Sequence, residues 1–370
     1  MGYFAGTYFD RCVEQLRTLA ESLDLNEATI RQALNLTVEP WFNRPIPERP
    51  AYLSDVGDDH TPFEYSAAFD ERDTELRLLT EVHGAPPTLL SNQRSALALN
   101  DSIQREFGTP FDRFNAIRDL FVSDRPGGLF TLWHSIGFRS NRKPSFKLYL
   151  NPQLHGVSEA SGVTEEAMQR LGFTPETIAL LNQIAFRGAA LDETKYFALD
   201  LSDDSKARVK IYYRHHDVSV SELEHICEFA PSHIQGDAER FVRGMMEYRD
   251  RYRKRPISTC FSFVAGQSEP SAVTMYAPVA DYCPDDRYIL EHTATFMDRH
   301  SLPGNRYRRM VDKFAQRDLS LGTGLHSYVA YRRTEHSHHV TAYLSAEVFT
   351  SPLSTFAPAN DVAVQTTSQT

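Results

Sequence analysis

Several short stretches of the chain alternate between polar and apolar residues, which is the pattern of a β-strand whose two faces differ. The clearest is "KARVKIYYRHH", at residues 206–216. One face of this strand carries Arg208, Lys210 and Tyr212, and the other face is apolar. Taken alone, the stretch fits an ordinary strand that buries its apolar face and turns its charged face to water. Its meaning therefore depends on whether the pattern recurs.

The same alternation recurs along the chain at a nearly constant spacing. Four such stretches carry Tyr149, Tyr212, Tyr276 and Tyr343 on their polar faces, at separations of 63, 64 and 67 residues. A further stretch, with Arg77 on its polar face, lies 72 residues before Tyr149. A long and regular period of this kind indicates a repeated supersecondary unit.

Each of these strands follows another strand across a short turn, so the pattern predicts five hairpins. They span residues 62–70 with 74–82, 129–138 with 144–150, 193–201 with 206–214, 257–266 with 271–278, and 324–333 with 338–345. The helical period takes over between the hairpins, and two helices are predicted before each one. The clearest helical stretches are residues 8–23, 26–36, 164–172, 174–186, 219–229, 236–252, 285–300 and 304–317.

The repeat predicts an α+β fold in which ten antiparallel strands form a closed β-barrel that is ringed by α-helices, in five αα-ββ units. The apolar strand faces then pack on the helices, and the polar faces line the lumen. A barrel of this size is wide enough to hold a ligand. We expect a single domain over residues 1–356 and a disordered polar tail over residues 357–370.

Composition narrows the classes of function. The 370 residues are 41% hydrophobic, with no apolar run that could cross a bilayer and no secretory signal, so we expect a soluble, cytoplasmic protein. Its four cysteines are scattered without a CxxC motif, which predicts free thiols. The net charge of -10 argues against a nucleic acid or an anionic membrane surface as the main partner.

The predicted lumen combines cations with phenol rings. The cations are Arg77, Lys147, Arg208 and Lys210, and the phenols are the four tyrosines of the repeat. Buried cations in this number require an anion with several charged oxygens, most simply a diphosphate. Aromatic faces attract a cation and exclude water from a reactive intermediate. Together they suit a reaction that separates a diphosphate from a carbocation, which is prenyl transfer.

An acid is also predicted to face the lumen. In "HTPFEYSAAF", Glu64 shares a face with Ser66 and Ala68, opposite Phe63 and Tyr65. A carboxylate in such a place can accept a hydrogen bond from the N–H of a heteroaromatic ring and act as a base. The alternative is that Glu64 forms a salt bridge with a lumen arginine.

These strands resemble those of the ABBA-fold aromatic prenyltransferases, in particular the indole branch of the dimethylallyltryptophan synthase type in its shorter, bacterial form. The resemblance covers roughly residues 1–350 at the level of the repeat. The segments that carry it are "PFEYS", "LRLLTEV", "FKLYLNP" and "RVKIYY".

The resemblance implies roles for individual residues. Glu64 matches the indole-binding acid of the family. Thr274 stands at a position where members of the family often carry a longer polar side chain. Diphosphate-binding positions are Arg77, Lys147, Arg208 and Lys210, together with Arg332 if Val329 and Tyr331 face outward. The carbocation shield is Tyr149, Tyr212, Tyr276 and Tyr343.

The resemblance also implies an activity. Dimethylallyl diphosphate would ionise, and the indole of L-tryptophan or a close derivative would attack the allyl cation. No metal would be required, and no other cofactor; the chain has no DDxxD cluster, so lysine and arginine would replace magnesium. A cyclic dipeptide, an indolactam or a phenolic ring are alternative acceptors.

Two neighbouring residues are candidates for the wall around the acceptor. His134 shares the parity of Leu132 and Ile136, which favours a histidine held beneath a helix, with a proton-shuttle role as the alternative. Trp133 has the opposite parity and either contacts substrate or packs in the interior. In "RRTEHSHHVT" the histidines fall at a predicted turn, which favours a solvated loop over a metal site.

Two other classes of function fit a barrel lined with cations. A tunnel-type phosphohydrolase needs several inward carboxylates to hold its metal ions, and only Glu64 is expected to point inward. A binding barrel that carries an isoprenoid or aromatic ligand would leave the four cations buried without partners. Metal-free turnover of dimethylallyl diphosphate would separate these possibilities.

Overall fold

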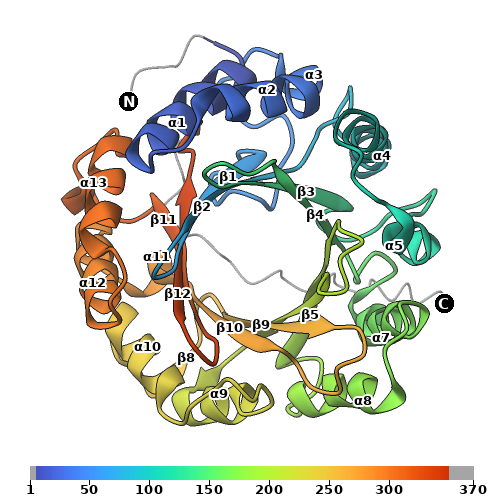
Figure 1. Cartoon of the computed structure of the whole chain (residues 1–370), viewed down its shortest axis with the longest axis vertical. Helices are drawn as coiled ribbons and strands as arrows, with labels where there is room; N and C mark the ends of the chain where they lie inside the picture. The colour runs from blue at the N-terminus through green and yellow to red at the C-terminus, as the bar shows by residue number, and fades with distance from the viewer. Residues whose placement is uncertain (1–5, 350–370) are drawn as a thin grey trace, which may run out of the picture.

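The computed structural model describes residues 6–349, and at its centre ten antiparallel strands close into a barrel (Figure 1). Along the chain, the barrel strands are β1 (Phe63–Phe69), β2 (Thr74–Thr80), β3 (Leu132–Phe138), β4 (Ser145–Leu150), β5 (Asp192–Asp200), β6 (Arg208–His215), β9 (Ile257–Val264), β10 (Ala272–Ala277), β11 (His326–Arg333) and β12 (His338–Ser345). Each strand pairs with the next, and β1 pairs with β12 to close the ring.

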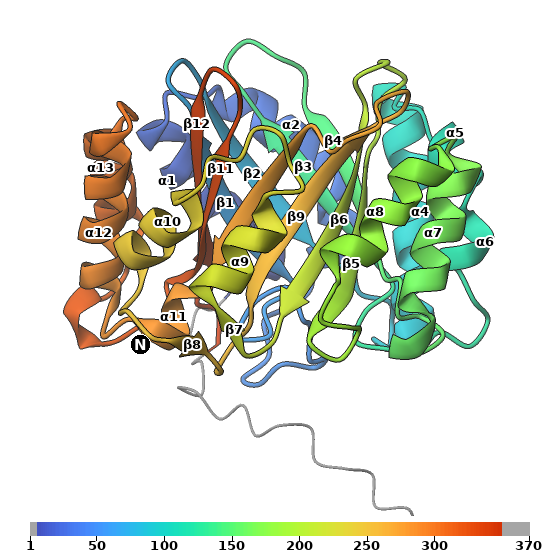
Figure 2. The ribbon, with the colours of Figure 1, turned by 90° about the horizontal axis from the view of Figure 1, so that it is seen from below.

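The five predicted hairpins and the closed barrel are therefore confirmed, with strand ends displaced by three residues or fewer. The predicted tail at residues 357–370 lies outside the described residues. The turns of the hairpins gather at one end of the barrel, which is the upper end in Figure 2.

Helices surround the barrel on its outer side (Figure 1). The longer ones are α1 (Tyr8–Ser22), α2 (Glu27–Thr37), α4 (Leu89–Phe107), α7 (Ala160–Arg170), α8 (Pro175–Ile184), α9 (Val220–Cys227), α10 (Asp237–Met245), α12 (Asp286–Arg299) and α13 (Gly304–Phe314). The short ones are α3 (Glu39–Phe42), α5 (Asp112–Asn115), α6 (Arg118–Phe121) and α11 (Val279–Tyr282). None of the helices within residues 6–349 has the length and apolar character needed to cross a bilayer.

The predicted helix at residues 236–252 is wrong in its second half. Helix α10 ends at Met245, and the backbone is extended at Met246. Arg251–Tyr252 then forms the short strand β8, which pairs with β7 (Val218–Ser219). Tyr252 is fully buried there, with its ring packed edge-on against Tyr282. Burial of this ring outweighs the helical preference of the segment.

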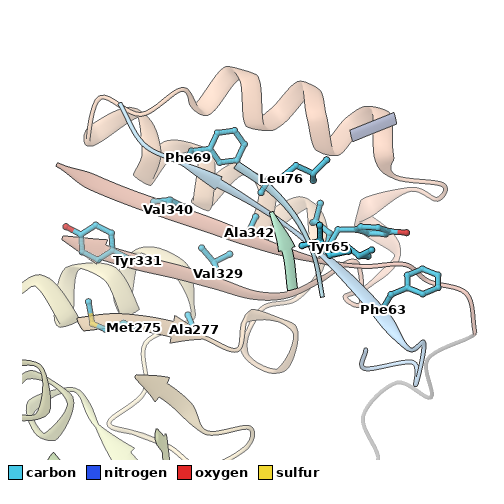
Figure 3. Close-up of a cluster of buried hydrophobic side chains, with 14 of the residues drawn as sticks. Phe63, Tyr65, Phe69, Leu76, Met275, Ala277, Val329, Tyr331, Val340 and Ala342 are labelled. Carbon is cyan, nitrogen blue, oxygen red and sulfur yellow. The ribbon is translucent and has the colours of Figure 1, made fainter. Parts of the chain in front are cut away.

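The apolar core lies between the barrel and the helices, as the alternation predicts. Figure 3 shows part of it, with side chains from the neighbouring strands β2, β1, β12, β11 and β10 gathered on the outer face of the sheet. Tyr65 on β1 packs against Phe314 of α13 and donates a hydrogen bond of 3.1 Å to Gln15 of α1. The four cysteines, all within the described part, are free thiols as predicted.

A buried ionic cluster joins β5 to β6 and the turn before β5. Asp192 accepts hydrogen bonds from Arg187 at 2.6 Å and from His215 at 2.7 Å, and all three side chains are almost completely buried. Because these groups satisfy one another away from water, the cluster fixes the lower end of the barrel.

Candidate active site

The lumen opens at the hairpin-turn end into a cavity of about 540 Å³. The inward face of each strand follows from the alternation in its sequence. Five predicted cations reach this cavity from four strands, namely Arg77, Lys147, Arg208, Lys210 and Arg332. Thr274, Tyr276 and Tyr343 also line it. The structure thus brings the predicted diphosphate-binding residues together in one place.

The sequence predicted that Arg332 lines the lumen only if Val329 and Tyr331 face outward, and the structure meets this condition. Val329 and Tyr331 point outward into the core, where Tyr331 stacks on Phe241 of α10. Arg332 therefore points inward and lines the cavity. Burial lowers the pKa of Arg332 to about 10, and the nearby guanidinium of Arg208 acts in the same direction.

Carboxylates also face this cavity, and the expectation that Glu64 alone points inward is wrong. Glu75 forms a close ion pair with Arg77. Asp200 lies 3.3 Å from the Nζ of Lys147 and accepts a hydrogen bond of 2.7 Å from the Nε of Arg208. Glu75 lies two residues before Arg77 on the same strand, so the alternation could have predicted its direction.

Below the cations, the four predicted shield tyrosines form a continuous layer of rings. The ring centroids of Tyr149 and Tyr212, of Tyr212 and Tyr276, and of Tyr276 and Tyr343 are each 5.8 Å apart. The hydroxyls of Tyr149 and Tyr212 are 3.3 Å apart and share a hydrogen bond. Burial raises the pKa of Tyr212 well above its usual value, so the layer presents neutral phenols to the lumen.

Glu64 lies in the same lumen, on β1, and is 7% exposed. Its Oε1 accepts a hydrogen bond of 2.5 Å from the hydroxyl of Ser327. Burial raises the pKa of Glu64 to about 8, and this hydrogen bond opposes the rise. The alternative salt bridge to a lumen arginine does not occur among residues 6–349, because the nearby Arg255 instead forms a two-pronged ion pair with Asp58 at 2.6 and 2.7 Å.

The end of the lumen beyond the tyrosine layer carries charged residues that the sequence analysis did not identify. Arg214 donates a hydrogen bond of 3.1 Å to the hydroxyl of Tyr196, and its guanidinium lies 4.0 Å from Asp55. Lys195 is buried nearby, 5.8 Å from the ring of Tyr196. The Oδ2 atom of Asp55 is buried and has no hydrogen-bond partner among the described residues.

Two β-bulges supply part of this charged end. In β5 the pairing with β6 shifts between Thr194 and Tyr196, so Lys195 is the extra residue. In β11 the pairing with β12 shifts between His326 and Val329. A bulge changes the direction in which a side chain points. Arg214, by contrast, shares the parity of Tyr212, so the alternation along β6 is enough to predict that it points into the lumen.

The segment from Tyr52 to Thr61, which leads into β1, covers this end of the barrel (lower edge in Figure 2). Ser54 donates a hydrogen bond of 2.6 Å to Glu81, at the end of β2. Val56 packs inside the lumen against Phe130 and Trp133. These contacts hold Asp55, between the two anchored residues, over the charged end.

The two residues predicted to form the wall around the acceptor, Trp133 and His134, point to opposite faces of β3. Trp133 points into the lumen, where its ring stacks on Phe130 at 4.0 Å and its indole nitrogen has no hydrogen-bond partner in the described chain. His134 points outward and forms a hydrogen bond of 2.7 Å with Asn100 of α4. The favoured interpretation of His134 as a histidine held beneath a helix is therefore confirmed, and the suggestion that it lines the acceptor site is wrong.

Of the three histidines near the last turn, His339 reaches the rim of the cavity. His338 forms a hydrogen bond of 2.8 Å with Tyr331, and His336 is largely exposed. They do not converge on one point.

Comparison with known proteins adds to this geometry. A family profile described as tryptophan dimethylallyltransferase matches residues 8–312. The structure is similar to that of 6-dimethylallyltryptophan synthase from Micromonospora olivasterospora in complex with DMASPP and Trp, with 33% identity, a TM-score of 0.87, and coverage of 92% of this chain and 97% of the other.

Two further similar structures carry related descriptions. One is 5-dimethylallyl tryptophan synthase from Streptomyces coelicolor in complex with DMASPP and Trp, with 27% identity, a TM-score of 0.86, and coverage of 96% and 100%. The other is the prenyltransferase PriB in ternary complex with L-tryptophan and dimethylallyl thiolodiphosphate, with 28% identity, a TM-score of 0.83, and coverage of 92% and 96%.

Proposed function

The chain belongs to the tryptophan dimethylallyltransferase family, and from this premise we propose that it transfers the dimethylallyl group of dimethylallyl diphosphate to the indole ring of L-tryptophan. One observation carries the proposal. A cation cluster, a layer of tyrosine rings and a buried carboxylate follow one another along a single lumen. These are the three parts that such a transfer needs.

The cation cluster binds the diphosphate of the donor. Lys210 and Arg332, which have no carboxylate partner among residues 6–349, are available to its oxygens, and Lys147, Arg77 and Arg208 surround them. As the allylic C–O bond breaks, negative charge passes to the diphosphate, and these groups stabilise it. Lysine and arginine thereby supply the charge that a divalent metal ion supplies in other enzymes, so the reaction needs dimethylallyl diphosphate as co-substrate and no metal.

The tyrosine layer surrounds the allyl cation that remains. Neutral phenol rings turn their electron-rich faces to the cation and leave no room for water, which would otherwise capture it. The hydrogen bond between Tyr149 and Tyr212 holds two of the rings in place.

The far end of the lumen binds the acceptor as a free amino acid. Lys195 and Arg214 suit its carboxylate, and the Oδ2 of Asp55, which accepts no hydrogen bond from the described residues, suits its ammonium group. A cyclic dipeptide has neither group, which favours L-tryptophan over that alternative. Trp133 and Val56 form an apolar wall beside the indole.

Glu64 acts on the indole itself. Its carboxylate accepts a hydrogen bond from the indole N–H, which stabilises the positive charge that develops on the ring when a ring carbon attacks the allyl cation. A new C–C bond forms, and loss of the proton from the attacked carbon restores the aromatic ring. The products are dimethylallyltryptophan and diphosphate.

A phosphohydrolase is less well supported. Although Glu75 and Asp200 face the lumen, each is already engaged by arginine or lysine and is not free to hold a metal ion. We also retain two expectations from the sequence, a single domain over residues 1–356 and a cytoplasmic location.

The test is incubation of the purified protein with L-tryptophan and dimethylallyl diphosphate in EDTA, followed by mass spectrometry and NMR. We expect one dimethylallyl group to be added to the indole. Glu64→Gln should retain pyrophosphate binding and lose most turnover. A wild-type protein that binds both substrates but forms no product, with or without Mg²⁺, would overturn the proposal.

A further inference from the structure

Two carboxylates lie inside the cluster of cations that faces the cavity. Asp200, at the end of β5, contacts both Lys147 and Arg208, and Glu75 on β2 contacts Arg77. Seven arginines and lysines line the cavity, against three carboxylates. The anion that the cavity binds therefore meets some cations, among them Arg77, Lys147 and Arg208, that already have carboxylate partners.

The contact between Asp200 and Lys147 is loose. The Nζ of Lys147 lies 3.3 Å from the Oδ1 of Asp200, yet this buried oxygen has no hydrogen bond of normal geometry within residues 6–349. The other oxygen, Oδ2, accepts a hydrogen bond from Arg208. Lys147 can turn toward an incoming phosphate oxygen without losing a well-formed hydrogen bond, whereas the carboxylate remains nearby.

A diphosphate bound to Lys147 and Arg208 therefore lies close to the negative charge of Asp200. Like charges at this range repel even when solvent screens them. The same acid also lowers the net positive charge of the site before the ligand arrives. Both effects weaken the binding of diphosphate, and both act on the donor and on the diphosphate product.

We propose that Asp200, assisted by Glu75, limits the affinity of the cation cluster for diphosphate, so that the product leaves after each turnover. This inference rests on the proposed function, because it assumes that a diphosphate occupies the cavity. The competing explanation is that Asp200 only positions Lys147 and Arg208. The two explanations predict opposite changes when the charge of Asp200 is removed and its shape is kept.

The experiment is isothermal titration of the full chain with inorganic pyrophosphate, comparing wild type with Asp200→Asn. We expect the variant to bind pyrophosphate about tenfold more tightly. In steady-state kinetics it should show a lower KM for dimethylallyl diphosphate, stronger inhibition by pyrophosphate and no increase in kcat. The matched control is Asp203→Asn, which removes a charge from the exposed turn after β5 and should leave the affinity unchanged.

Weaker binding in Asp200→Asn would overturn the inference and assign Asp200 a positioning role, and unchanged affinity would overturn the inference as well. If thermal unfolding shows that this variant does not fold, the same titration of Glu75→Gln decides, with tighter binding again expected. A wild-type protein that does not bind pyrophosphate at all would contradict the proposed function itself.

Discussion

Removal of the hydroxyl of Ser327 tests the protonation state of Glu64. Ser327 donates a hydrogen bond of 2.5 Å to the buried carboxyl group of Glu64, whose pKa burial raises to about 8. A hydrogen bond that is donated to a carboxylate favours its charged form. Ser327→Ala should therefore raise the pKa of Glu64 further.

The size of this change follows from the strength of the bond. A hydrogen bond to a charged group contributes about 1.5–3 kcal/mol, and one pKa unit corresponds to about 1.4 kcal/mol, so we expect a rise of about one to two units. If Glu64 works as a carboxylate, about a tenth of the wild-type enzyme is active at pH 7. In Ser327→Ala this fraction falls by a further factor of about 10–100.

The assay is the dependence of kcat/KM for L-tryptophan on pH, from pH 6 to 9.5, because this parameter reports ionisations of the free enzyme. The wild-type profile should rise with pH, pass its midpoint near pH 8 and level off above about pH 9, and the Ser327→Ala profile should still be rising at pH 9.5. Ser66→Ala, which removes another lumen hydroxyl on the same strand as Glu64, should leave the midpoint in place. A Ser327→Ala midpoint at or below that of wild type would refute the reasoning.

Three other changes have distinct expected outcomes. Lys210→Ala removes a lumen cation that has no carboxylate partner within the described residues 6–349, and it should raise the KM for dimethylallyl diphosphate at least tenfold with little change in the KM for L-tryptophan. Steady-state kinetics with each substrate varied will measure both constants, and an equal rise in the two would contradict the assignment. Asp192→Ala leaves Arg187 and His215 without their buried carboxylate partner, so it should lower the free energy of unfolding by about 3–5 kcal/mol, as measured by urea denaturation. A loss below about 1 kcal/mol would mean that the ionic cluster does not stabilise the barrel. Glu64→Gln should raise Tm by more at pH 8 than at pH 5. Burial raises the pKa of Glu64 from 4.5 to about 8, so ionisation of this carboxyl group opposes folding as the pH rises between these two values. Equal gains in Tm at both pH values would argue against a raised pKa.

The diphosphate end of the lumen could be predicted from sequence because it follows the strict alternation of its strands. Arg77, Lys147, Arg208 and Lys210 each lie on the inward parity, and each lines the cavity. Glu75 obeys the same rule, since it lies two residues before Arg77 on β2 and lines the same cavity.

The acceptor end was harder to predict because its geometry departs from the repeat. Lys195 occupies a bulge, so alternation alone assigns its direction wrongly. The bulge in β11 left the orientation of Arg332 undecided from sequence for the same reason. Asp55 lies in a segment without regular structure, where no period exists to place a side chain. Local sequence pattern determines direction only where pairing is regular.

Closure of the barrel through β1 and β12 has a consequence for how the protein folds. Glu64 is aligned with Ser345 across this seam, and its hydrogen-bond partner Ser327 is 263 residues away in the chain. Contacts of such long sequence separation form late and slowly, since the entropy of closing a large loop must be lost before they contribute. During synthesis the ribosome must release nearly the whole chain before Glu64 can meet its hydrogen-bond partner Ser327. Until then β1 is an unpaired sheet edge that is open to aggregation, so the last repeat both completes the site and protects the first.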